Sequence, residues 1–185
     1  MIEPFGLLLA FSGAGTGDVR FALSEGADAL RWRVLGAGAG TLSGAESPFL
    51  VREESGRVVC LTAVGGELLA WFSGDLAGWD GPHVLPVGVA GAGAPKAYRD
   101  GGSWKLIFTA GGRAFSALTS DFRTVSTVTP LIEQAGSDVA LLHTAGGVFA
   151  FHAPGGRLVQ SRADGSVVTE IGAGNAAVVF AGLGG

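Results

Sequence analysis

Ser73-Gly74-Asp75-Leu76-Ala77-Gly78-Trp79 is the stretch on which the fold of this chain depends, because its pattern recurs. Asp75 precedes Trp79 by four residues, and three more aspartates have an aromatic or β-branched residue at this offset: Asp28 before Trp32, Asp121 before Val125, and Asp164 before Val168. Successive aspartates are 47, 46 and 43 residues apart. A period in the forties with strand-like flanks is typical of propeller blades of four short strands. The aspartates are expected to accept backbone N–H groups in turns, and the aromatic residue to pack between blades.

The composition is that of one globular domain, residues 1–185. Hydrophobic residues make up 48% of the chain, and 33 glycines lie in short clusters, which favours many tight turns over disorder. The net charge is −4 and no Lys/Arg cluster is present, which argues against a nucleic-acid partner. The single cysteine, Cys60, lies in an apolar run and excludes an internal disulfide. No Cys/His cluster has metal-ligand spacing, so neither a metal nor another cofactor is expected.

The N-terminal segment carries no basic region, and its apolar run, Gly6–Phe11, is short. We therefore expect no signal peptide, no transmembrane span and no membrane partner, and we predict a cytoplasmic protein.

The rest of the chain divides into short β-runs punctuated by Gly, Ser and Asp, and no stretch has a helical period. The expected class is all-β. The first repeat has three runs, Gly6–Phe11, Asp18–Ser24 and Arg31–Leu35. The next three repeats have four runs each: Pro48–Glu53, Arg57–Val64, Glu67–Ser73 and His83–Val87; Pro95–Asp100, Trp104–Ala110, Ala114–Thr119 and Ser126–Leu131; Asp138–Thr144, Val148–His152, Arg157–Ser161 and Ser166–Ile171.

The first repeat lacks an innermost strand, and the C-terminus offers a spare one, Asn175–Gly182. If this strand pairs beside Gly6–Phe11, both chain ends complete the first blade and no apolar sheet edge is left open. The prediction is a four-bladed propeller with blades at about 1–40 plus 175–183, 46–88, 94–132 and 137–172. A five-bladed ring requires a miscounted blade or chains that pool blades, which would make a homo-oligomer.

Three segments carry a family resemblance. Glu46–Arg52 (Glu-Ser-Pro-Phe-Leu-Val-Arg) resembles the Asp-Pro-apolar strand that opens a blade in the propeller glycosidases of glycoside hydrolase family 43 and their invertase-like relatives. Ala94–Leu106 resembles the opening of their following blade, and Trp71–Trp79 is similar to their Ser-x-Asp-Leu-x-x-Trp turn. The resemblance covers about residues 45–125. It implies a propeller fold of reduced size, since the family is longer and five-bladed.

The resemblance also implies acidic catalytic residues at the starts of inner strands, and here this sequence departs from the family pattern. Ser47 precedes Pro48 where the family has Asp, and Lys96 follows Pro95 where the family has an acid. The fourth repeat offers Asp138 but no Glu-Gly-Pro. The departures put family-type glycosidase chemistry in question.

Blade geometry predicts which residues share a face. Inner strands begin on the same face as the loops between second and third strands, whereas the four repeat aspartates lie on the opposite face. Near the axis the predicted ligand face carries Glu46, Ser47, Lys96, Asp138 and Asn175. Farther out it carries Asp18, Glu67, Arg113 and His152. Polar groups that converge at an apolar mouth suit a small molecule or a sugar.

Lys96 is the most informative of these residues, because an ammonium on an inner strand needs an anionic partner or a lowered pKa. Glu46 and Asp138 are the candidate partners, and a ligand anion or sugar oxygen is the alternative. The leading hypothesis is a small-molecule or carbohydrate-active enzyme, with Glu46 and Asp138 as the acid/base pair and Lys96 stabilising negative charge. The other hypothesis is a non-catalytic propeller that binds a ligand or another protein.

Overall fold

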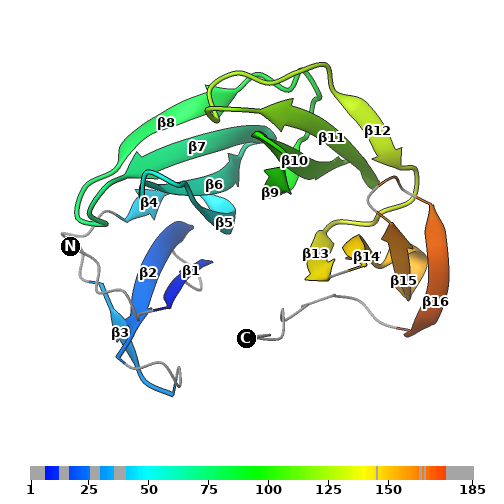
Figure 1. Cartoon of the computed structure of the whole chain (residues 1–185), viewed down its shortest axis with the longest axis horizontal. Helices are drawn as coiled ribbons and strands as arrows, with labels where there is room; N and C mark the ends of the chain where they lie inside the picture. Colours follow the sequence, from blue (N-terminus) through cyan, green and yellow to red (C-terminus); the bar gives the residue numbers. More distant parts are fainter. Residues whose placement is uncertain are drawn as a thin grey trace.

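The computed structural model describes residues 7–12, 17–25, 30–35, 41–144, 146–162, 164 and 166–173. In this described part, sixteen strands form four antiparallel sheets of four strands, which follow one another along an arc as the blades of a propeller (Figure 1). A single 3₁₀ turn, Pro154–Gly156, interrupts the strands of the described part. None of the described residues form a helix long and apolar enough to cross a membrane. The predicted all-β propeller of four blades is confirmed.

The second, third and fourth sheets are simple meanders in which each strand pairs with the next along the chain. The second sheet comprises β5 (Glu46–Arg52), β6 (Val58–Val64), β7 (Glu67–Ser73) and β8 (Asp80–Leu85). The third comprises β9 (Gly93–Asp100), β10 (Ser103–Ala110), β11 (Arg113–Thr119) and β12 (Thr129–Ile132). The fourth comprises β13 (Val139–Thr144), β14 (Gly147–His152), β15 (Arg157–Arg162) and β16 (Val167–Ala173).

The first sheet is built differently. Its strands are β1 (Leu8–Ser12), β2 (Asp18–Ser24), β3 (Trp32–Val34) and β4 (Leu42–Ser43), and the last two pair with opposite ends of β2. β1 contacts β5 of the next sheet as β6 contacts β9 of the sheet after that. Because β6 is the second strand of its blade, β1 also occupies the second position in its blade. Within the described part of the chain, no strand pairs with the inner edge of β1. This agrees with a first repeat that lacks its innermost strand. The proposed closing strand, residues 175–182, lies outside the described residues.

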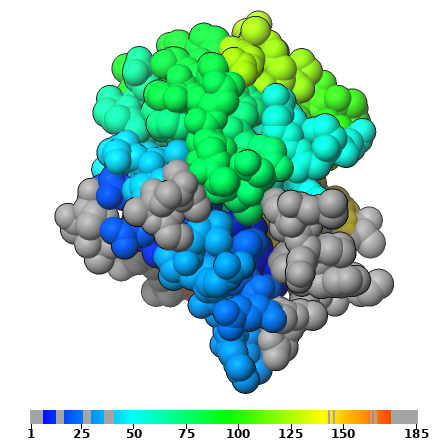
Figure 2. Space-filling view, turned by 90° about the vertical axis from the view of Figure 1, so that its left-hand side faces the viewer, coloured from blue at the N-terminus to red at the C-terminus, as the bar shows by residue number. Residues whose placement is uncertain are grey.

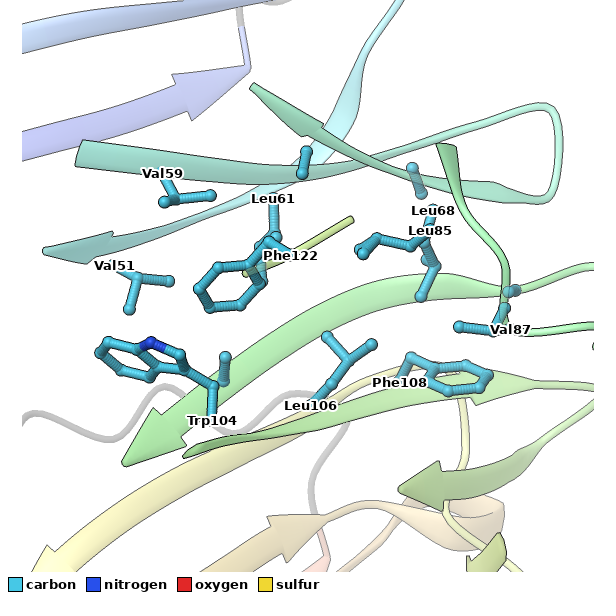
Figure 3. Packing of buried hydrophobic residues seen from close by; sticks show 14 of the residues in the cluster. Val51, Val59, Leu61, Leu68, Leu85, Val87, Trp104, Leu106, Phe108 and Phe122 are labelled. Atoms are coloured by element: carbon cyan, nitrogen blue, oxygen red, sulfur yellow. The ribbon is translucent and has the colours of Figure 1, made fainter. Parts of the chain in front are cut away.

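The largest hydrophobic cluster joins the second and third sheets. Side chains from β5, β6, β7 and β10 point toward one another between the sheets, with Phe122 at their centre (Figure 3). Phe122 is fully buried and packs against Trp104 at a ring distance of 5.6 Å. Alternate residues of each strand supply this core, as expected for a sheet whose face packs on a neighbouring sheet.

A second cluster joins the first and second sheets. Trp79 follows the turn after β7 and stacks on Phe21 of β2, with ring centroids 4.6 Å apart. The first sheet lies directly against the second in Figure 2, where blue atoms meet cyan and green ones. The predicted packing of the recurrent aromatic residue between blades is therefore confirmed at Trp79.

The aspartate turns have the predicted hydrogen bonds. Oδ1 of Asp75 accepts the N–H groups of Ala77 and Gly78, at 2.8 and 3.2 Å. Oδ1 of Asp121 accepts those of Arg123 and Thr124, both at 2.9 Å. Oδ1 of Asp164 accepts the N–H of Ser166 at 2.8 Å. Asp28 lies outside the described residues.

Candidate functional site

A hollow of about 400 Å³ opens on the predicted ligand face, where β5 and β9 begin. The turns between β6 and β7 and between β10 and β11 complete it, together with the residues that precede β13. Most of its wall consists of small residues, which leaves backbone groups accessible. The lining residues are Glu46, Ser47, Ala63, Val64, Gly65, Gly66, Gly91, Ala92, Gly93, Ala94, Thr109, Ala110, Gly111, Gly112, Gly136 and Ser137.

One side of the hollow depends on close contact between two backbones. The N–H of Ala92 donates to the carbonyl of Gly66 at 2.9 Å. A Cβ at Gly66 would lie 3.0 Å from the Cα of Gly91, and Gly66 has a φ of +87°. Only glycine satisfies both conditions without strain. Gly66 is thus required by the shape of this wall.

Both inner strands bend where they enter the hollow. Ser47 precedes Pro48 and has a φ of 51°, and Ala94 precedes Pro95 and has a φ of 48°. The ladder register shifts between Glu46 and Phe49, which is a β-bulge at Ser47. Left-handed conformations of residues other than glycine cost about 1–2 kcal/mol each. Bulges re-aim side chains and are frequent beside binding sites, and both strained residues line the hollow.

Among the described residues that line the hollow, Glu46 is the only charged one. It is exposed, and no described residue forms an ion pair or a side-chain hydrogen bond with its carboxylate. The hollow therefore presents a carboxylate that is available to a ligand.

Lys96 and Asp138 form an ion pair next to the hollow. The Nζ of Lys96 lies 3.1 Å from Oδ1 of Asp138 and 5.8 Å from the ring centre of Phe49. The lysine side chain is 15% exposed and the aspartate side chain 57%. Asp138 also accepts the N–H of Val139 at 2.7 Å. The prediction that Lys96 pairs with one of two carboxylates is confirmed, and its partner is Asp138.

Thr109 links the third sheet to the segment that leads into the fourth. Its buried hydroxyl donates to the carbonyl of Ser137 at 3.0 Å and lies 3.4 Å from the carbonyl of Gly93. Because Ser137 lines the hollow and precedes Asp138, Thr109 helps to position both. Sequence reasoning missed Thr109, since no motif marks a hydroxyl whose partners lie 16 and 28 residues away.

The four residues predicted farther out do not line the hollow. Asp18 begins β2 and is half-buried. Glu67 begins β7 and lines a separate, mostly apolar hollow of about 270 Å³ formed with residues 84–90. Arg113 begins β11 and pairs with Glu133 at 2.8 Å. Asn175 lies outside the described residues.

His152 ends β14 and is buried, with Nε2 at 2.9 Å from the hydroxyl of Ser161. Burial lowers the pKa of His152 below its ordinary value, while the nearby backbone of Gln134 acts in the opposite direction. The imidazole is therefore held in its neutral form within the fourth sheet.

Neither thiol nor metal chemistry is evident in the described part of the chain. Burial raises the pKa of the Cys60 thiol to about 12, so Cys60 is not a nucleophile near neutral pH. No group of three His, Cys, Asp or Glu side chains among the described residues could hold a metal ion.

No protein-family model and no curated protein sequence matches the chain. Solved structures do match its fold. An endo-1,4-β-xylanase from Bacteroides thetaiotaomicron has 15% identity and a TM-score of 0.67, and the match covers 97% of this chain and 72% of that one. The GH43 protein BlXynB from Bacillus licheniformis has 12% identity and a TM-score of 0.64, with coverage of 89% and 39%. A bifunctional GH43-CE protein from Bacteroides eggerthii has 15% identity and a TM-score of 0.66, with coverage of 97% and 26%.

The NanB sialidase from Streptococcus pneumoniae also matches, at 20% identity and a TM-score of 0.50, over 82% of this chain and 27% of that one. These likenesses show a glycosidase-like propeller fold. The chain spans 72% of the xylanase but about two-fifths or less of the other three proteins.

Proposed function

We propose that this propeller binds a carbohydrate in the hollow at the start of β5 and β9. The observation that carries the proposal is the carboxylate of Glu46, which has no partner among the described residues and lies in a wall of small residues. Carboxylates accept hydrogen bonds from pairs of neighbouring hydroxyl groups, and exposed backbone groups add further donors and acceptors. A hollow of about 400 Å³ falls within the range of small-ligand sites, roughly 300–1,000 Å³.

The fold supports a carbohydrate more than another small molecule. Propellers of similar structure include proteins named as a xylanase and a sialidase. The bulged inner strands direct Glu46 and Ser47 to the ligand face, where the family resemblance implies a ligand site. The Lys96–Asp138 ion pair lies beside the same site, where Asp138 follows Ser137 of the hollow.

Glycoside hydrolysis by Glu46 and Asp138 is the second candidate function. It is favoured by the position of Asp138 directly after Ser137, which lines the hollow together with Glu46. Inverting hydrolysis requires two carboxyl groups roughly 6.5–9.5 Å apart, one protonating the leaving group and one activating water. Asp138 would first have to exchange its contact with Lys96 for one with substrate or water. Binding without catalysis requires no such exchange, and we therefore place it first.

A glycan array and a panel of aryl glycosides test both functions on the wild type, Glu46→Gln and Asp138→Asn. We expect the wild type to bind at least one class of glycan, Glu46→Gln to lose that binding, and no glycoside to be cleaved. Cleavage that is lost in both variants would instead establish hydrolysis. Glycan binding that is unchanged in Glu46→Gln, or no binding to any glycan, would contradict the proposed site.

A further inference from the structure

The charge balance around the hollow is uneven. Each nearby cation has an anionic partner: Lys96 lies 3.1 Å from Asp138, and Arg113 lies 2.8 Å from Glu133. Glu46 has none among the described residues. The described part of the hollow thus carries one uncompensated negative charge.

The walls offer little to hold a neutral sugar by its apolar face. The lining residues described here include no aromatic ring on which a sugar could stack. What remains are backbone groups, the hydroxyls of Ser47 and Ser137, and the Glu46 carboxylate. Hydrogen bonds in which one group is ionised are roughly twice as strong as neutral ones. The contact with Glu46 should therefore decide which ligand is preferred.

We propose that the hollow selects a carbohydrate that carries a protonated amine, such as an amino sugar, over neutral and acidic sugars. The inference rests on the proposed carbohydrate-binding function and specifies its ligand class. Glu46 is exposed, so solvent and salt weaken the attraction. An exposed ion pair contributes up to about 1 kcal/mol, which corresponds to a preference of up to about fivefold.

Glucosamine, glucose and glucuronate are suitable probes, because they share one ring and differ in charge. Their dissociation constants would be measured by NMR titration of the full chain near neutral pH, at low and at high salt. Glu46→Gln removes the proposed contact. Glu25→Gln is the matched control, because Glu25 is also exposed and lies beyond the far end of β2, on the opposite face.

We expect glucosamine to bind roughly threefold or more tightly than glucose. We expect this preference to fall at high salt, to vanish in Glu46→Gln and to persist in Glu25→Gln. Equal affinity for glucosamine and glucose, or tighter binding of glucuronate, would overturn the amine preference and leave the carbohydrate site standing. Failure of all three sugars to bind would overturn this inference, and failure of every glycan on the array as well would overturn the proposed function.

Discussion

Two of the repeat aspartates, Asp75 and Asp121, act together with a hydroxyl two residues before them. The hydroxyl oxygen of Ser73 accepts the N–H of Leu76 at 2.8 Å, and that of Thr119 accepts the N–H of Phe122 at 2.9 Å. Leu76 and Phe122 have φ values of 63° and 55°. In each turn, several hydrogen bonds offset the cost of the strained backbone at this residue. The side chains of Leu76 and Phe122 are both buried. The turn thus anchors a core residue at the end of its blade.

Asp121→Ala should lower the free energy of unfolding by about 1 kcal/mol, by analogy with other side-chain caps. The variant loses the acceptor for the N–H groups of Arg123 and Thr124. Asp121→Asn keeps a carbonyl acceptor and should lose less stability, as urea denaturation would show. Asp75→Ala should change stability in the same direction. Sugar binding should be unaffected, and a well-folded Asp121→Ala that no longer binds would show that the two faces have been assigned the wrong way round.

Lys96→Met should reduce stability by less than about 1 kcal/mol, because its partner Asp138 is 57% exposed and keeps its water. The double-mutant cycle with Asp138→Asn measures the coupling directly. Sugar binding should persist, since Lys96 is not among the residues that line the hollow. If binding collapses while the fold survives, Lys96 itself contacts the ligand and is more than a structural counter-ion.

At the scale of strands, the sequence predicts most of the structure. β2 and β7 match the predicted ranges Asp18–Ser24 and Glu67–Ser73 to the residue, because apolar residues there are bounded by turn residues. β4 was not predicted, since two residues carry no periodic signal. The strand starts also predicted that Glu46 and Ser47 lie on one face, and a hollow opens there. The hollow itself was not predictable, because its walls depend on backbone contacts such as that of Gly66 with Gly91.

Stability should depend on pH through the fourth sheet, where β14 and β15 enclose His152. Burial lowers the pKa of His152 from 6.5. As the pH falls, His152 therefore binds a proton at a higher pH in the unfolded chain than in the folded chain. The stabilisation is therefore complete above about pH 6.5 and is lost as the pH falls through and below that value. Melting temperatures between about pH 7.5 and 5 should decline more steeply for the wild type than for His152→Asn. Equal slopes would contradict the neutral, buried imidazole.

The turn aspartates act in a more acidic window. The N–H groups of Ala77 and Gly78 lower the pKa of Asp75, and the hydroxyl and N–H of Ser166 lower that of Asp164. Their contribution is present above the ordinary aspartate value of 3.8 and is lost as the pH falls below it. Protonation of His152 and protonation of the turn aspartates therefore lower stability in two different pH ranges.

At the scale of the whole molecule, the first blade determines how the ring of blades is closed. β1 lies in the second position of its blade, and Leu7 and Leu9 are 43% and 45% exposed. An apolar edge of this kind readily pairs with other chains. We predict that β1 pairs with the segment Asn175–Gly182 of the same chain, which would complete a four-bladed ring. The alternative is a five-bladed ring, which requires a miscounted blade or blades pooled between chains.

Deletion of residues 175–185 should therefore give insoluble or strongly destabilised protein, because the edge at Leu7 and Leu9 would remain open. Deletion of residues 183–185 alone is the matched control and should leave the melting temperature unchanged. Light scattering and thermal unfolding distinguish the two truncations. A soluble 1–174 chain that melts at the wild-type temperature would contradict closure by the C-terminal strand.

The most direct test of the proposed site is an NMR titration that maps where a sugar binds. Seven glycines line the hollow, and their amide signals fall in a distinct spectral region. We predict that glucosamine shifts the amides of Gly66, Gly93 and Gly112 in the wild type and leaves them unshifted in Glu46→Gln. Shifts confined to the opposite face, at the turns of Asp75 and Asp121, or shifts that persist in Glu46→Gln, would contradict the account.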